Sequence, residues 1–78
     1  MDRDLALIVA NAGQQACREL TGIMPMLAKH LPDDKELRLG IAAVIHEISV
    51  SVIEPAFRAH PDLEAEFEAR VKKYDRYI

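Results

Sequence analysis

The residues best suited to chemistry in this chain are its three histidines, His30, His46 and His60, and its single cysteine, Cys17. Long stretches separate the histidines, and the chain has no H-x-x-x-H, H-E-x-x-H or C-x-x-C spacing of the kind that metal sites use. The carboxylate motif of helical di-metal proteins also needs a glutamate three residues before a histidine, and none is present. We therefore expect no bound metal and no cofactor.

Nucleophilic catalysis has equally little support in the pattern. Cys17 would need a neighbour that stabilises its thiolate, and Arg18 and Glu19 point elsewhere on a helix. Ser49 follows His46 by one helical turn, but the sequence supplies no orienting acid and no oxyanion hole beside them. We name no catalytic residue and expect a protein without enzymatic activity.

The C-terminal run 70–78 mixes basic and aromatic residues, which is the one pattern that could suit nucleic acid. Glu66 precedes the run, Asp75 interrupts it, and the whole chain has a formal net charge of −3. Because neutralised phosphates supply most of the affinity for nucleic acid, we do not expect that partner.

Apolar residues recur at helical spacing along the whole chain, and no segment requires a strand. Prolines and glycines divide the chain into helices over about 2–21 or 2–30, then 33–59 and 61–76. At 78 residues the chain is expected to form one domain, 1–78. The sequence predicts a small all-α antiparallel bundle that oligomerisation completes, because so short a chain buries only a thin core.

Three local signals bear on where these helices begin and break. Asp2 and Asp33 are residue types that cap helix N-termini. Pro25, three residues after Gly22, should either kink the first helix or split it, which would give four helices. Pro55 should bend or end the middle helix near its last turn.

The middle helix is apolar on two opposite sides, which is the most informative pattern in the chain. One side carries Leu37, Ile41, Val44, Ile45, Ile48, Val52 and Ala56. The other is a heptad-like seam of Leu39, Ala43, His46, Val50, Ile53 and Phe57. Two arrangements would bury both sides: the outer helices clasp the middle one, or the seam meets a second copy. We favour the second copy, in a two-fold homodimer or a higher oligomer.

The first helix also has two apolar lines. The larger stripe includes Leu5, Ile8, Ala12 and Ile23, and a second line consists of the small residues Ala6, Ala10, Gly13 and Cys17. Small residues let another helix approach closely, and we favour packing within the chain over a contact between subunits. In the alternative, Gly13→Leu would break the subunit interface by steric overlap.

The preferred function is a non-enzymatic helical interaction or regulatory module that acts as a homo-oligomer, with the seam as its interface. His46 is its candidate ligand-binding or pH-sensing residue, because histidine titrates near neutral pH. The first alternative is a small ligand-binding protein or enzyme with a pocket near His46, and the second is a nucleic-acid accessory protein. Another protein could also be the partner.

Two further expectations concern location. The most apolar run, 40–53, is shorter than the roughly 20 residues that span a bilayer, so we expect no membrane segment. A lone thiol and the absence of a signal peptide after Met1 favour the cytoplasm.

Overall fold

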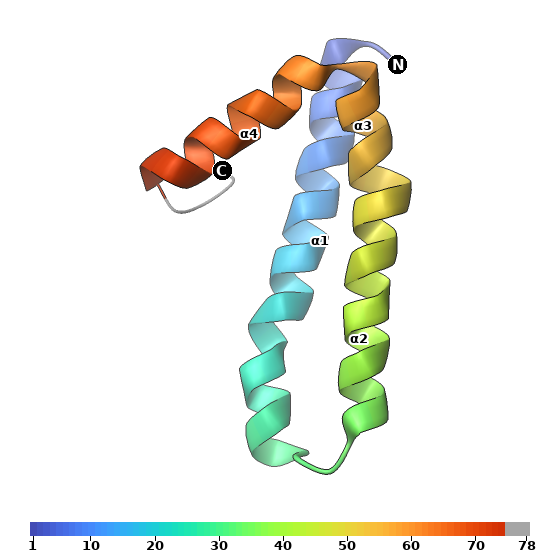
Figure 1. Ribbon diagram of the computed structural model, residues 1–78, viewed down its shortest axis with the longest axis vertical. Coiled ribbons are helices and arrows are strands. Elements are labelled where there is room, and N and C mark those ends of the chain that lie inside the picture. The colour runs from blue at the N-terminus through green and yellow to red at the C-terminus, as the bar shows by residue number, and fades with distance from the viewer. Residues whose placement is uncertain (75–78) are drawn as a thin grey trace.

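The computed structural model describes residues 1–74, and every regular element in that range is helical. The elements are α1 (Arg3–His30), α2 (Lys35–Ile48), the short π-helix η1 (Ser49–Ile53), α3 (Glu54–Ala59) and α4 (Pro61–Tyr74). Because α2, η1 and α3 follow one another without a break, residues 1–74 form three helices (Figure 1). The all-α fold class is confirmed, while residues 75 and 76 of the expected third helix lie outside the described residues.

Capping carboxylates start the two long helices. The Leu5 N–H donates to Asp2 Oδ1 over 2.7 Å, which is the cap expected at the start of α1. The Leu37 N–H donates to Asp34 Oδ1 over 3.0 Å, so Asp34 caps α2 and the expectation of Asp33 in that role was wrong by one residue. The intervening loop turns the chain back and makes an antiparallel hairpin (Figure 1). One arm of the hairpin is α1, and the other arm consists of α2, η1 and α3.

The prolines inside the long helices are accommodated in different ways. Helix α1 runs through Pro25 without interruption, so the alternative of a fourth helix is wrong. In the other arm η1 lies directly before Pro55, and the Glu54 N–H donates to the Ser49 carbonyl five residues earlier. Proline has no N–H and its ring collides with the carbonyl four residues before it, and a wider π turn relieves that collision.

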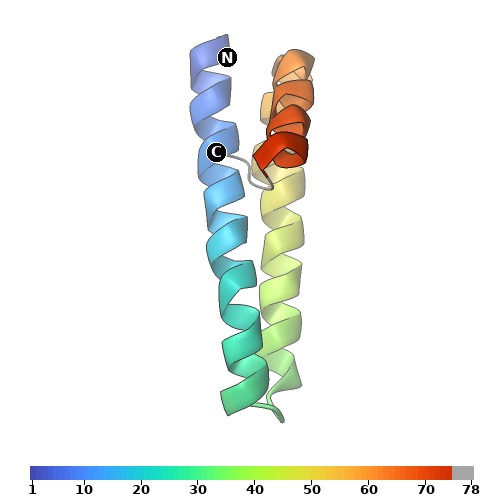
Figure 2. The same ribbon diagram turned by 90° about the vertical axis from the view of Figure 1, so that its left-hand side faces the viewer.

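Helix α4 leaves the top of the hairpin at an angle and packs on it through its first half (Figures 1 and 2). Leu63 and Phe67 of α4 are buried there against small residues of the hairpin, in a core cluster completed by Ala6, Ala10 and Ala56. The Phe67 ring meets Phe57 with 5.5 Å between centroids. Within residues 1–74, α4 packs along neither the length of α2 nor its outer side, so the outer helices do not clasp the middle one.

The molecule is extended for its size. Its Cα radius of gyration is 14.3 Å, whereas a compact domain of this length has about 11.5 Å. Its accessible surface is 5529 Å², against about 4,800 Å² for a monomer of this mass. The excess of roughly 700 Å² is close to what one partner contributes to a standard protein interface.

Charged side chains hold α4 to the start of α1. Arg3 Nε donates to Asp62 Oδ2 over 2.7 Å, and Arg3 Nη2 donates to Glu66 Oε2 over 2.8 Å. The other Glu66 oxygen, Oε1, accepts from Arg70 Nη2 over 2.6 Å. These bonds lower the pKa of Asp62, chiefly through its hydrogen bond with Arg3, and raise the pKa of Arg3.

We expect Arg3→Ala to loosen α4, because it removes both ion pairs between the start of α1 and α4. The hairpin should stay folded, because these ion pairs are solvent-exposed and each contributes little to stability. Hydrogen exchange should then quicken in α4 and stay unchanged in α1 and α2. Because the pKa of Asp62 is lowered in the folded protein, its bond with Arg3 stabilises the fold at pH values above the ordinary aspartate pKa. This stabilisation is lost as the pH falls through the pKa that Asp62 has in the folded state. Acid below about pH 4 should therefore loosen α4 in the parent protein and add little in Arg3→Ala. The control is Arg18→Ala, an exposed arginine of the same helix.

Candidate interaction surfaces

The line of small residues on α1 is the contact between the two arms. Ala6, Ala10 and Gly13 are all buried, and a Cβ built on Gly13 would lie 2.6 Å from Ile53 Cγ1 of the opposite arm. Farther along the same line, Cys17 Sγ lies 3.8 Å from the Ile45 carbonyl oxygen. The small residues therefore serve close packing within one chain, as favoured from the sequence.

The six residues of the expected seam do not form one surface. Four of them are exposed on the outer edge of this arm: Leu39, Ala43 and His46 in α2, and Val50 in η1. Leu39 is 70% accessible. Ile53 is only 6% accessible and faces Gly13, while Phe57 packs against the Phe67 ring. The reason is η1: one extra residue in a turn rotates all later side chains by about 100°. Ile53 and Phe57 are thus corrected to interior positions, and the exposed remainder is called the outer edge.

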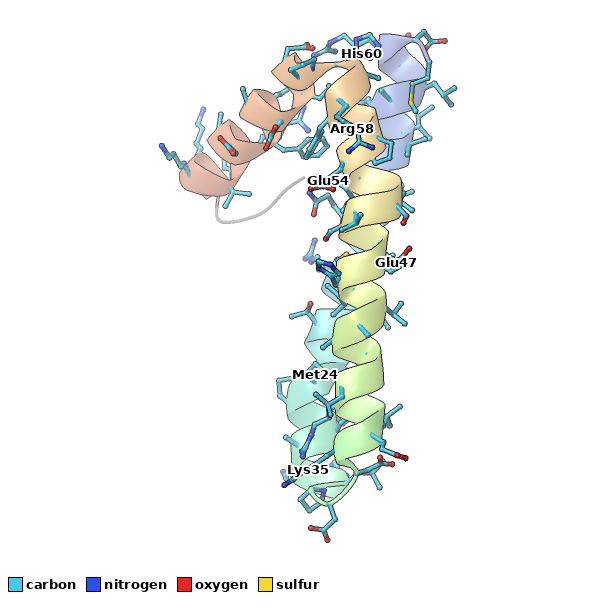
Figure 3. The ribbon with its side chains drawn as sticks, turned by 45° about the vertical axis from the view of Figure 1, so that its right-hand side comes forward. Met24, Lys35, Glu47, Glu54, Arg58 and His60 are labelled. Carbon is cyan, nitrogen blue, oxygen red and sulfur yellow. The ribbon has the colours of Figure 1, made fainter. Side chains whose placement is uncertain are left out.

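A larger apolar surface lies on the side of the hairpin away from α4. Helical spacing from the buried line of each arm places its members on one side, which we call the open face: Leu5, Ala12, Ile23, Leu37 and Val44. Leu5 is 47% accessible and Val44 is 51% accessible. In Figure 3, Glu47 lies on the side of the hairpin away from α4, and Glu54 lies on the side toward α4. No helix of residues 1–74 covers the open face.

The borders of the open face are acidic. Helical position places Glu19, Glu36 and Glu47 along them, and Glu47 Oε1 accepts a hydrogen bond from the Ser51 hydroxyl over 2.6 Å. An apolar centre with a polar rim is the usual anatomy of a protein–protein interface.

His46 is exposed on the outer edge and points to the side that carries α4, away from the open face. Cys17 is half-buried at the contact between the arms, so the two residues do not share a pocket. His30 is the last residue of α1, and His60 Nε2 lies 3.0 Å from the Met1 carbonyl oxygen. Among residues 1–74, no three His, Cys, Asp or Glu side chains come together as a metal site would require.

A cleft of about 400 Å³ opens where α4 diverges from the hairpin. We call it the wedge, and its lining residues are Gln14, Phe57, Glu64, Phe67, Glu68, Val71 and Lys72. Its floor is aromatic and aliphatic, whereas its rim carries two glutamates, one lysine and one glutamine. Neither His46 nor Cys17 lines it, and the sequence pattern did not reveal it because its depth depends on the angle of α4.

The arm Lys35–Ala59 is long and apolar enough to cross a membrane by length and composition alone, with a mean hydropathy of 1.4 over its most apolar window. This is weak support for a membrane span, because the core helix of a water-soluble protein passes the same criterion. Only 17% of that window is buried within the protomer, so most of its apolar surface still lacks cover.

Comparisons with protein-family models, with curated proteins and with solved structures gave no match. The arguments for function therefore come from the chain's own surfaces.

Proposed function

We propose that this protein is a non-enzymatic helical interaction module that works as a homodimer, with two hairpins packed through their open faces. The observation that carries the proposal is the open face itself, a set of exposed aliphatic side chains along both arms that no helix of residues 1–74 covers. Two hairpins joined this way would form two packed layers of helices, which is the common way to bury helix stripes.

The available area supports a second copy as the cover. The surface in excess of a compact monomer, roughly 700 Å² per chain, is near the ~800 Å² that each partner brings to a stable interface. A two-fold axis lets one apolar patch complement itself without a second protein.

A membrane is a weaker alternative for the same face. Glu19, Glu36 and Glu47 border it, and the chain has a net charge of −3. Helices that lie on membranes usually carry lysine and arginine beside the apolar stripe, because the lipid surface is anionic. The acidic rim favours a protein partner.

Val44→Glu is expected to convert the dimer into a monomer. Val44 lies in the open face, and pairing would bury two unpaired carboxylates, one from each copy. We expect the dimer to weaken at least ~100-fold, about 3 kcal/mol, measured as molar mass by light scattering across a dilution series.

Leu39→Glu is the matched control, because Leu39 is an equally apolar and exposed residue on the outer edge of the same helix. It should leave the dimer intact. A monomeric parent protein would contradict the proposal. Dissociation by Leu39→Glu but not by Val44→Glu would move the interface to the outer edge, which includes His46.

A further inference from the structure

Helix α4 divides its charge sharply between its two halves. Acidic residues occupy its first half (Asp62, Glu64, Glu66 and Glu68), and basic residues occupy its second half (Arg70, Lys72 and Lys73). Such a division complements the helix dipole, which is a sufficient local reason for it. It also makes the helix complementary to a copy of itself that runs in the opposite direction.

The acidic half is only partly used within the protomer. Asp62 and Glu66 are engaged by Arg3 and Arg70. Glu64 and Glu68 line the wedge, and within residues 1–74 neither makes an ion pair. The wedge therefore offers two available carboxylates above an apolar floor that includes Phe57 and Val71.

Among residues 1–74, the last turn of the basic half has no acidic partner. Lys73 Nζ lies over the Tyr74 ring at 5.1 Å from the centroid, and no ion pair joins Lys72 or Lys73 to a carboxylate among the described residues. Tyr74 is 60% accessible. Figure 1 shows this end of α4 projecting away from the hairpin, where another molecule can reach it.

We propose that the wedge is occupied by α4 of a second copy, lying antiparallel to the first. Lys72 at the basic end of each helix, which lines the wedge together with Glu64 and Glu68, then meets those carboxylates of the other copy. Lys73 lies on the far side of α4 and adds only to the overall charge of that end, and each exposed Tyr74 reaches toward the other copy's apolar floor. One two-fold axis satisfies both wedges at once, since the same surface supplies the groove and its occupant.

A second copy fits this site better than other partners. A nucleic acid would meet Glu64 and Glu68 as well as the lysines, and like charges at an interface oppose binding. The α4 contact lies on the opposite side of the hairpin from the open face, so it does not depend on the proposed function. Where both contacts form, dimers would pair into a larger assembly.

The test uses two charge-reversed chains. One carries Glu64→Lys with Glu68→Lys, which makes α4 basic along most of its length; the other carries Lys72→Glu with Lys73→Glu, which makes it acidic. Both are made in the Val44→Glu background, where the open face no longer pairs, and in the parent background. The mass of each chain, and of an equal mixture, is measured by light scattering at about 0.05 M and about 1 M salt, where screening is weak and strong respectively.

In the Val44→Glu background we expect a dimer at low salt and a monomer at high salt. Each charge-reversed chain alone should stay monomeric, and the equal mixture should regain the low-salt dimer. In the parent background, the change from low to high salt should convert a pair of dimers into single dimers. This second measurement still tests the α4 pairing if Val44→Glu lowers the helical content. Failure of the open-face proposal would appear separately, as a parent protein that is never more than a dimer and returns to monomer in high salt.

A matched control reverses two acidic residues far from the wedge, Glu19→Lys with Glu36→Lys, and should leave the salt-dependent step in place. A mass that does not depend on salt in either background would overturn the α4 pairing. So would a mixture that fails to regain the mass that the separate chains have lost.

Discussion

Gly13→Leu is expected to push the two arms of the hairpin apart and to destabilise the protein by about 3 kcal/mol or more. A single Cβ at this position would already lie 2.6 Å from Ile53 Cγ1 and 3.3 Å from Val52 Cγ1. Leucine adds three further carbons at a point where the opposite arm has no room, because the adjoining residues of the line, Ala6 and Ala10, are fully buried. The measurement is the urea midpoint of unfolding at one fixed protein concentration, since dimerisation makes stability depend on concentration.

The other two glycines provide an unusually close control. A Cβ added at Gly22 or Gly40 meets nothing within 4 Å, and both residues lie inside helices. Gly22→Ala and Gly40→Ala should therefore stabilise the protein by roughly 0.5–1 kcal/mol each, because alanine loses less backbone entropy in a helix. Gly13→Ala should destabilise it despite the same gain. Equal stabilisation at all three positions would mean that the arms are not in close contact at Gly13.

The helices could be anticipated because their signals are local. Asp2 caps α1, residues 31–34 separate α1 from α2, and Pro61 is the first residue of α4. Each signal acts over a few residues. The continuity of α1 through Pro25 was not decidable from the sequence, since a proline within a helix can either bend or end it. Packing against neighbouring elements decides such cases, and α1 packs against α2, η1 and α3 of the opposite arm.

The faces were harder to predict than the helices. Periodicity alone put Ile53 and Phe57 in line with Leu39, because a regular α-helix was assumed throughout. The π turn at η1 rotates them into the interior, and its only sequence signal is Pro55 a few residues later. On α1 the bulkiest stripe, which includes Ile8, is left exposed, whereas the smallest residues form the contact. The size of the apolar side chains therefore did not indicate which side of α1 faces the other arm, since close packing of two helices needs small side chains where they meet.

Phe67→Ala should detach α4 from the hairpin and remove about 3–5 kcal/mol of stability, a large share of what a domain of this size has. Phe67 and Leu63 are the two largest fully buried side chains, and they supply most of the apolar contact between α4 and the rest of the molecule. Losing the ring removes the contact with Phe57 and the Arg70 guanidinium that lies 5.6 Å from its centroid. What is left to hold α4 is the buried contact of Leu63 and the exposed ion pairs of Arg3, and the ion pairs contribute little.

The change should be visible as a lower urea midpoint and as fast hydrogen exchange throughout α4, with slow exchange kept in the middle of the hairpin. Tyr74→Ala is the control, because it removes an aromatic ring of similar size from the same helix at an exposed position. Both variants are compared at about 1 M salt, where the charges of the proposed α4 pairing are screened. It should alter stability by less than about 0.5 kcal/mol. Equal losses from the two substitutions would mean that α4 is held by its charges and not by its buried ring. The wedge would then have no fixed geometry, and the pairing of α4 with a second copy would lose its structural basis as well.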